Sequence, residues 1–405
     1  MKRKISDLAV FGGSPAFSEK LHVGLPNIGN RERLLERIND MLDRRWLSND
    51  GPFSQELERR IAEMLGVKHC VAMCNGTVAL EIAIRALGLA DEVIVPSFTF
   101  IATAHALEWQ RIRPVFCDVD METHSLDPGC IEKMITPRTT GIVGVHLWGE
   151  THHIEALEHI AKRRNLRLLF DAAHAFASSY KGTMVGNFGD AEVFSFHATK
   201  FFNTFEGGAI VTNRDDLAEK IRLMRNFGFS RQNYDEVVYV GTNGKLNEAS
   251  AAMGLTSLES LDEFIATNRS NHAAYRQELD GIPGIRLRRS DDTQGSNYQY
   301  VIVEVDESVT NVSRDTLVKI LHAENVLARR YFYPGCHGME PYRSYQPHAH
   351  LLLPNTLKLV HRVMALPTGT GVKDSDIGTI GQLLRLTVSE SDEVVRRLGA
   401  NSSVS

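Results

Sequence analysis

Short apolar runs alternate with amphipathic stretches between about residues 65 and 215. The runs that we interpret as strands are Glu92–Pro96, Pro114–Asp118, Gly141–His146, Leu166–Phe170, Ala191–Phe196 and Gly208–Thr212. The stretches with helical periodicity are Thr77–Leu87, Ile101–Gln110, His152–Arg164 and Asp215–Asn226. Most runs lack a strict alternation of polar and apolar residues, which is typical of strands buried on both faces. The pattern predicts an α/β domain in which helices cover both faces of a mostly parallel sheet.

The chain changes character after the helical stretch Glu248–Phe264, because residues 290–295 are polar and rich in turn formers. The following stretches predict a small α+β unit, with strands at Tyr298–Val305 and Val326–Tyr333 and a helix at Ser313–Glu324. A chain of 405 residues also exceeds one ordinary domain. We therefore predict an N-terminal segment and a large α/β domain over residues 1–265, and a smaller C-terminal α+β domain over residues 266–405.

Composition narrows the class of protein. A net charge of −5 gives no electrostatic footprint for nucleic acid or for an anionic membrane surface. Five cysteines are few and odd in number, so we expect core thiols rather than a disulfide framework. Cys70 and Cys74 lack a second pair with ligand spacing, so we expect no metal site. No apolar run is long enough for a signal peptide or a membrane span, and we expect a cytoplasmic protein.

Asp171 and Lys200 follow two of the predicted strands and are expected at the same edge of the sheet. A carboxylate among apolar residues needs a cation or a donor. A direct Asp171–Lys200 ion pair is the simpler interpretation. The alternative is a site for pyridoxal phosphate (PLP), which needs a lysine for its aldehyde and a carboxylate that keeps its pyridine nitrogen protonated.

Other residues supply what such a cofactor needs, although each also has an ordinary interpretation. Gly76 and Thr77 begin a predicted helix and offer amides and a hydroxyl to a phosphate, although Thr77 also suits a plain N-cap. Ser195 is either a third phosphate donor or a buried core hydroxyl. Phe100 suits stacking on a flat ring or a place in the core. His174 suits a bond to the phenolic oxygen of PLP or a place in the core.

The sequence resembles the DegT/DnrJ/EryC1/StrS family of nucleotide-sugar aminotransferases, which are fold-type I PLP enzymes, from Leu8 to about Leu384. Six motifs carry this resemblance, and they occur in order along the chain. They are Cys74-Asn-Gly-Thr77, Pro96-Ser-Phe-Thr-Phe100, Asp171-Ala-Ala-His174, Phe194-Ser-Phe-His-Ala-Thr-Lys200, Glu206-Gly-Gly208 and Gly241-Thr-Asn-Gly-Lys-Leu-Asn247.

The resemblance implies a role for each residue that faces the cofactor ring. It implies that Lys200 carries PLP as a Schiff base and acts as the catalytic base, and that Asp171 pairs with the pyridine nitrogen. It implies that Phe100 stacks on the ring. His174 stands where many members of the family have Gln, and it would bind the phenolic oxygen.

The same resemblance implies a phosphate site and a partner subunit. Gly76, Thr77 and Ser195 would hold the cofactor phosphate. Asn247 would reach a phosphate in the neighbouring subunit, which implies a homodimer with shared active sites.

The resemblance also implies a substrate class. One branch of the family consists of dehydratases that carry histidine in place of the lysine, whereas this chain has Lys200. The segment Phe194–Glu206 is most similar to enzymes that transfer an amino group from glutamate to C4 of a dTDP-4-keto-6-deoxyhexose. Arg329 and Tyr331 resemble the segment that faces the nucleotide sugar, although a solvated basic face is an equal interpretation.

Alternatives to C4 amination remain open at this point. One alternative is a related aminotransferase that acts on a 3-keto nucleotide sugar, although those enzymes usually have Tyr-Pro or a similar pair before the lysine. A PLP-binding regulatory protein would bind the cofactor without turnover. A nicotinamide-dependent sugar enzyme is set aside, because no Gly-x-Gly-x-x-Gly motif follows an early strand.

Overall fold

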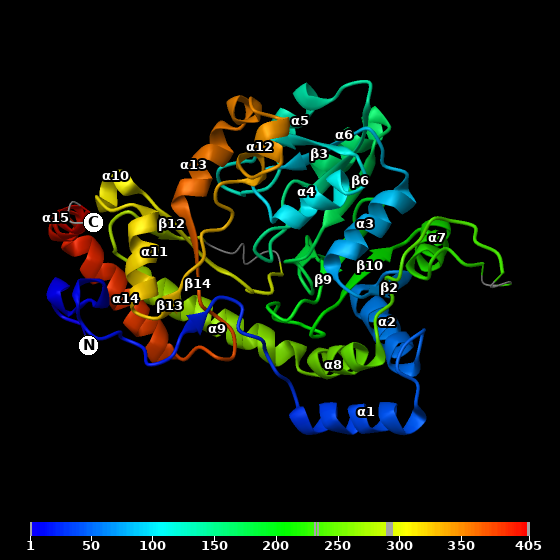
Figure 1. The fold of residues 1–405 in the computed structure, drawn as a ribbon, viewed down its shortest axis with the longest axis horizontal. Coiled ribbons are helices and arrows are strands. Elements are labelled where there is room, and N and C mark those ends of the chain that lie inside the picture. The colour runs from blue at the N-terminus through cyan, green and yellow to red at the C-terminus, as the bar shows by residue number, and fades with distance from the viewer. Residues whose placement is uncertain (1, 231, 233–234, 289–294, 403–405) are drawn as a thin grey trace.

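A seven-stranded sheet forms the centre of the larger part of the molecule in the computed structural model, which describes residues 2–230, 232, 235–288 and 295–402 (Figure 1). In spatial order its strands are β2 (His69–Met73), β10 (Gly208–Thr212), β9 (Ala191–Ser195), β6 (Arg167–Asp171), β5 (Thr139–Val145), β3 (Glu92–Pro96) and β4 (Arg113–Cys117). All neighbours run parallel except β10, which is antiparallel to both β9 and β2. The predicted mostly parallel sheet is therefore present.

Helices cover both faces of this sheet, because its strands bury both sets of alternating side chains. One face packs against α3 (Gly76–Leu87), α4 (Ile101–Glu108) and α7 (Asp215–Arg225). The opposite face packs against α2 (Pro52–Leu65), α5 (Pro128–Met134), α6 (Ile154–Arg164) and α8 (Glu248–Glu259). In β10, for example, Ile210 joins the first core, whereas Ala209 and Val211 join the second.

A smaller unit surrounds a three-stranded antiparallel sheet of β11 (Ile285–Leu287), β12 (Val301–Val305) and β14 (Val363–Leu366). Its core is shared with α9 (Leu261–Leu279), α11 (Arg314–Ala323) and α14 (Asp374–Ser389). The remaining elements are short or peripheral: η1 (Ile5–Asp7), η2 (Ala9–Phe11), β1 (Leu21–His22), α1 (Arg31–Arg44), β7 (Ser179–Tyr180), β8 (Thr183–Met184), α10 (Glu307–Thr310), β13 (Val326–Leu327), η3 (Cys336–Gly338), α12 (Tyr342–Tyr345), η4 (Ala349–Leu352), α13 (Pro354–Arg362) and α15 (Ser391–Ser402). Within the described part of the chain, no helix combines the length and the apolarity needed to cross a membrane.

Most predicted elements lie within two residues of their observed bounds, and three differences are informative. Strand β2 was missed. The predicted helix over 248–264 is two helices that meet at Ser260. The predicted strand over 326–333 was wrong beyond Leu327. Val326 and Leu327 pair with β1, Arg329 forms a separate antiparallel bridge to Ala365 of β14, and the chain then turns. The polar segment 290–295 lies, except for Gly295, outside the described residues.

The N-terminal segment packs against the smaller unit, although it precedes the larger unit in the sequence. Strand β1 pairs with β13, and Leu8 is buried in the core of the smaller unit. The boundary between residues 265 and 266 remains a prediction, and we propose that the N-terminal segment up to about residue 23 belongs structurally with the smaller unit.

The segment around η3 crosses from the smaller unit onto the larger one. The amide of Cys336 donates to the Ser97 carbonyl (2.9 Å), and the amide of His337 donates to the Ser97 hydroxyl (3.1 Å). The same hydroxyl lies 2.7 Å from Nδ1 of His337. Cys336, Tyr342 and Leu353 are buried in the core that α3 and α4 form on the large sheet. Residues near position 340 therefore complete the core of the larger unit.

Gly208 allows a close backbone approach beside the start of α3. A Cβ atom at this position would lie 2.7 Å from the carbonyl oxygen of Phe194 and 2.9 Å from backbone atoms of Asn75 and Gly76. These contacts are all with backbone, so a side chain cannot be accommodated by a change of rotamer. Glycine at this position lets β10 approach the turn that leads into α3.

We predict that Gly208→Ala lowers the free energy of unfolding by about 1–3 kcal/mol, because the added methyl overpacks against backbone. Urea denaturation measures the change. The matched control is Gly378→Ala in α14, where the new Cβ would be 3.8 Å from its nearest neighbour, in Glu278. This control should be neutral or stabilising by about 0.5–1 kcal/mol. Equal midpoints for the two variants would contradict the close approach.

Candidate active site

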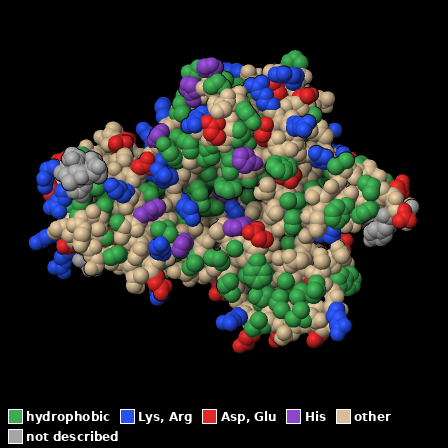
Figure 2. Space-filling view, viewed as in Figure 1, with side chains coloured by type: hydrophobic (Ala, Val, Ile, Leu, Met, Phe, Trp, Pro, Cys, Tyr) green, Lys and Arg blue, Asp and Glu red, His purple; other side chains and the backbone are tan. Residues whose placement is uncertain are grey.

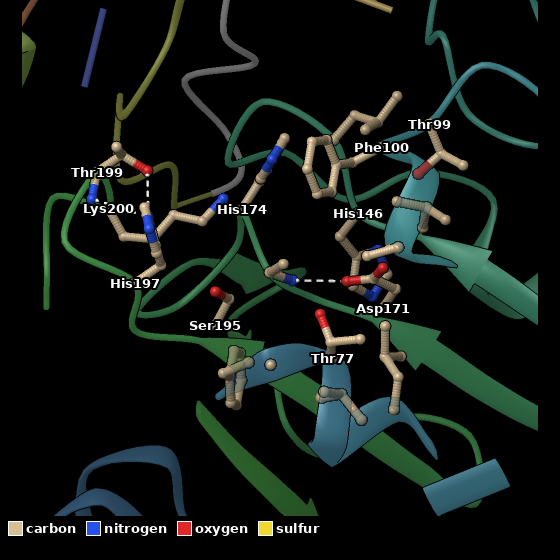
Figure 3. A pocket seen from close by; sticks show the side chains of 18 of the residues that line it. Thr77, Thr99, Phe100, His146, Asp171, His174, Ser195, His197, Thr199 and Lys200 are labelled. Atoms are coloured by element: carbon tan, nitrogen blue, oxygen red, sulfur yellow. Dashed lines mark hydrogen bonds between the residues drawn. The ribbon is translucent and has the colours of Figure 1, made fainter. Parts of the chain in front are cut away.

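A cavity of about 250 Å³ opens at the carboxyl ends of β5, β6 and β9, beside the first turn of α3 (Figure 3). Parallel strands bring their carboxyl ends to one edge of a sheet, which is where open α/β sheets bind ligands. Most of the site residues predicted from the sequence line this cavity. Those that line it are Gly76, Thr77, Phe100, Asp171, His174, Ser195, Lys200 and Tyr331.

Asp171 ends β6 and is buried. Its Oδ2 accepts a hydrogen bond from the Thr103 hydroxyl (2.7 Å), and its Oδ1 accepts one from the amide of Ala173 (3.1 Å). Burial raises the pKa of Asp171, while these two donors and the positive charge of Lys200 oppose the rise. Each carboxylate oxygen has further acceptor capacity, so Asp171 is able to receive another donor from the cavity.

Lys200 follows β9 and extends its amine into the cavity from the side opposite Thr99 and Phe100 (Figure 3). Its Nζ lies 3.4 Å from the hydroxyl of Tyr300. Burial lowers the pKa of Lys200 to about 8, although the charge of Asp171 acts in the other direction. The direct ion pair with Asp171 is not found among the residues that the structure describes. The amine is therefore more nucleophilic at neutral pH than that of an ordinary lysine.

His174 and Tyr300 lie beside this amine. Nε2 of His174 is 3.2 Å from the Tyr300 hydroxyl, and the two ring centroids are 4.5 Å apart. Burial, reinforced by the charge of Lys200, places the pKa of His174 well below its ordinary value. The imidazole is therefore neutral near pH 7. Its Nδ1 is buried and has no hydrogen-bond partner within the described part of the chain.

The first turn of α3 presents amides to the same cavity. Asn75 caps this helix, because its side-chain oxygen accepts from the amide of Val78 (2.8 Å). The helix thus begins at Gly76, and Thr77 lies in the first turn and is not the N-cap. The amides of Gly76 and Thr77 have no acceptor inside the helix, which makes this end suited to an anion. A Cβ on Gly76 would lie 2.9 Å from Cβ of Ser195, so glycine brings the two elements together.

Phe100 precedes α4 and covers another side of the cavity. Phe100 is 56% exposed, which is unusual for a large aromatic residue between a buried strand, β3, and the helix that follows it. An exposed ring above a cavity is suited to stacking on a planar ligand.

Two predicted site residues lie outside this cavity. Asn247 is exposed and caps α8, where its side chain accepts from the amide of Ser250 (2.8 Å). Arg329 is exposed, and its backbone pairs with Ala365. The structure brings neither residue to the lining of the cavity in the same chain.

Sequence reasoning missed three residues that surround the predicted ones. The Thr103 hydroxyl donates to the Asp171 carboxylate, and the amide of His146 donates to the Asp171 carbonyl (3.0 Å). Tyr300 contacts both Lys200 and His174. Tyr300 lies in a predicted strand, where an aromatic residue is ordinarily part of the core. No local pattern around Tyr300 distinguished it from such a core residue, and its contact with Lys200 appears only in the structure.

The donor set is suited to PLP. One cavity is lined by residues that supply each group that PLP needs. These groups are an amine with a lowered pKa, a buried carboxylate, an unpartnered imidazole nitrogen, an exposed aromatic ring and free amides at the start of a helix. The fold and the cavity thus define a PLP-dependent transferase with the α/β fold predicted from the sequence.

Comparison with known proteins agrees with this class. Residues 29–385 match the DegT/DnrJ/EryC1/StrS aminotransferase family, and the chain belongs to that family. This membership confirms the predicted fold class, the PLP cofactor and the aminotransferase class of enzyme.

Three relatives illustrate the similarity. The chain is 38% identical to a dTDP-4-amino-4,6-dideoxy-D-glucose transaminase of Shigella dysenteriae, over 80% of this chain and 87% of that protein. It is 34% identical to an enzyme of the same name in Escherichia coli, over 89% and 96% of the two chains. It is 50% identical to DesI, which was crystallised in the presence of its TDP-sugar product, with a TM-score of 0.93 over 97% of this chain and 99% of that one.

We predict that the apoenzyme captures PLP faster as pH rises, with a half-maximal rate near pH 8 and a plateau above about pH 9, because only the neutral amine attacks the aldehyde. With a pKa of about 8, roughly 300 times more amine is neutral at pH 7 than in an ordinary lysine. Stopped-flow absorbance measures the rate across the pH range.

Two variants control this experiment. Lys200→Ala should show no absorption band of covalently bound cofactor. Lys181→Ala removes an exposed lysine that pairs with Glu155 at the surface, and it should keep the profile of the unmodified protein. A rate that continues to climb toward pH 10 would show that Lys200 titrates as an ordinary lysine.

Proposed function

We propose that this protein transfers an amino group from glutamate to the C4 ketone of a dTDP-4-keto-6-deoxyhexose, giving a dTDP-4-amino-4,6-dideoxy sugar. The observation that carries the reaction class is the Lys200 amine, which shares one cavity with the buried carboxylate of Asp171. The names of the transaminases from S. dysenteriae and E. coli and the TDP-sugar product of DesI support the substrate.

We assign the residues around the cofactor ring by their positions. Bound PLP supplies a ring that withdraws electrons from the carbon bearing the amino group. Asp171 would hold the ring nitrogen in its protonated form, since it retains acceptor capacity and is buried. Phe100 would cover one face of the ring. The unpartnered Nδ1 of His174 would meet the phenolic oxygen.

Lys200 would first bind the cofactor and then move the proton. Its amine has a pKa of about 8, so both the neutral and the charged form are accessible near neutral pH. A general base is most effective when its pKa lies near the working pH. Lys200 is therefore suited to accept a proton from the donor amino acid and to return one to the sugar.

The phosphate and the substrate would occupy opposite ends of the cavity. Gly76, Thr77 and Ser195 would hold the cofactor phosphate at the first turn of α3. Tyr331 lines the cavity near Trp148 and Tyr300, and we propose that it faces the sugar. Arg329 stays a prediction, since its exposed side chain lies outside the lining.

A homodimer with shared active sites is part of the proposal. Exposed apolar side chains of α1 and the following segment, defined here as the α1 face, gather at the lower end of the molecule (Figure 2). The α1 face consists of Leu35, Leu42, Trp46 and Leu47, each about half exposed. It is continuous with Asn247, because the amide of Glu248 donates to the carbonyl of Leu47 (3.0 Å). A second copy on this face would bring Asn247 toward the phosphate of the partner's site.

A substrate panel tests the reaction. The holoenzyme is incubated with glutamate and, separately, with dTDP-4-keto, GDP-4-keto and dTDP-3-keto deoxysugars, and 2-oxoglutarate is measured. We expect turnover with the dTDP-4-keto sugar and at least tenfold lower kcat/KM with the others. A preference for the GDP sugar would match the name of another relative, the GDP-perosamine synthase of Caulobacter vibrioides. It would overturn the assignment of dTDP as the nucleotide. Cofactor binding without any product would favour a regulatory protein. The cytoplasmic location expected from the sequence stays a prediction.

Mixed dimers test the shared site. Asn247→Asp keeps a good N-cap for α8 but removes the amide donor and adds a negative charge. If Asn247 serves the partner's cavity, a dimer of one Lys200→Ala chain and one Asn247→Asp chain has one site with both changes and one with neither. Mixing the two inactive proteins in equal amounts and allowing exchange should then restore about a quarter of the activity, since half of the random dimers are mixed.

The outcome separates two placements of Asn247. If Asn247 served the cavity of its own chain, every site in the mixture would carry one change and no activity would return. Each variant unmixed, carried through the same exchange procedure, provides the control.

A further inference from the structure

Three side chains form a hydrogen-bonded chain at one side of the cavity. Lys200 Nζ lies 3.4 Å from the Tyr300 hydroxyl, and that hydroxyl lies 3.2 Å from Nε2 of His174. Figure 3 shows the Lys200 amine extending toward His174. The remaining ring nitrogen of His174, Nδ1, is buried without a partner in the described residues. The proposed function uses Lys200 and His174 but gives Tyr300 no role.

The hydrogens in this chain are assigned by donor and acceptor capacity. Burial raises the pKa of Tyr300, so its hydroxyl keeps its single hydrogen. The Lys200 amine donates to the hydroxyl oxygen, and the Gln299 side chain, which counteracts the rise in the pKa of Tyr300, is a further donor to it. The hydroxyl hydrogen is then directed to the acceptor, Nε2 of His174. A neutral imidazole carries one hydrogen, so when Nε2 accepts, that hydrogen is on Nδ1.

We propose that Tyr300 is a positioning residue that fixes His174 in the tautomer with its hydrogen on Nδ1, so that this nitrogen donates to the phenolic oxygen of the bound cofactor. The proposal rests on the proposed function for the identity of that cofactor. It adds a residue that neither the sequence motifs nor the relatives' names assign.

The tautomer matters because the two forms place opposite groups at Nδ1, the buried nitrogen that the proposal assigns to the cofactor. With hydrogen on Nδ1, the imidazole offers a donor to an oxygen that carries negative charge. With hydrogen on Nε2, it offers a lone pair to the same oxygen. A hydrogen bond to a charged group contributes roughly ten- to a hundredfold in affinity, so loss of the preferred tautomer has a measurable effect.

The first test reads the tautomer directly in the apoenzyme. Protein labelled with ¹⁵N-histidine is examined by long-range ¹H–¹⁵N correlation, which distinguishes a protonated ring nitrogen from one with a lone pair. We expect Nδ1–H for His174 in the unmodified apoenzyme. In Tyr300→Phe we expect a mixture of both tautomers, since the phenyl ring offers no hydrogen to Nε2.

The second test reads the consequence for the cofactor. Tyr300→Phe should weaken PLP binding about tenfold and shift the absorption maximum of the bound cofactor. The key comparison is His174→Gln, whose amide carries donor hydrogens and has no tautomer to set. Adding Tyr300→Phe to His174→Gln should change the PLP dissociation constant by less than about twofold.

A matched control loses a buried tyrosine hydroxyl far from the cavity. Tyr275 is fully buried in the smaller unit, and its hydroxyl donates to the carbonyl of Pro367 (2.9 Å). Tyr275→Phe should lower the urea midpoint and leave the PLP affinity and spectrum unchanged.

The two tests also separate this proposal from the proposed function. The same Nδ1–H tautomer in Tyr300→Phe, or an equal effect of Tyr300→Phe with and without His174→Gln, overturns the role of Tyr300 while PLP binding and turnover stand. Failure of the unmodified protein to bind PLP overturns the proposed function instead, and the tautomer in the apoenzyme is still read independently.

Discussion

The active site depends on holding an amine and a carboxylate in one cavity without letting them neutralise each other. Burial opposes charge on both groups, lowering the pKa of Lys200 to about 8 and raising that of Asp171. A direct ion pair would be the simplest compensation, but it would leave neither group free for a ligand. The protein instead supplies neutral partners, with Thr103 for the carboxylate and Tyr300 for the amine. Attraction between the two charges remains available to a bound cofactor that lies between them.

The geometry of the sheet makes this separation possible. Asp171 ends β6, and Lys200 follows β9, the next strand in space, after the turn that ends the strand. Strand β10 then returns antiparallel against β9 and begins with Gly208, which allows the first turn of α3 to approach the same edge. The anion-binding amides, the carboxylate and the amine therefore come from elements that the sheet holds at fixed spacing. Tyr300 arrives from the other unit, next to β12.

Much of this arrangement could be predicted from the sequence, because it depends on local patterns. Fully buried strands such as β3 and β10 read as apolar runs with clear ends, and the order of motifs places Asp171 and Lys200 at strand ends. Strand β2 was missed because its short run of four apolar residues merges with the turn before α3. The strand predicted through Tyr333 ends early because the chain turns toward η3, a contact between distant segments that no local pattern encodes.

Side chains that act through another residue were beyond the reach of the pattern. Thr103 and Tyr300 have unremarkable local contexts, the first turn of a helix and the residue before a strand. Their importance comes from contacts with residues about 70 and 100 positions away in the chain. For Asn247 the limitation is in the structure of a single chain. The family resemblance implies that it contacts a phosphate in the partner subunit, whereas within its own chain it only caps α8.

The contact of η3 with Ser97 has a consequence for how the chain is made. Cys336, Tyr342 and Leu353 fill part of the core beneath α3 and α4, and the smaller unit also takes in Leu8 from the first residues. The larger unit therefore cannot finish packing until residues 336–353 have emerged from the ribosome, and the smaller unit cannot finish until α14 has emerged, although Leu8 is available from the start. During that interval the unfinished core around α4 exposes apolar surface of the kind that chaperones bind, so biogenesis of this enzyme is expected to be largely post-translational.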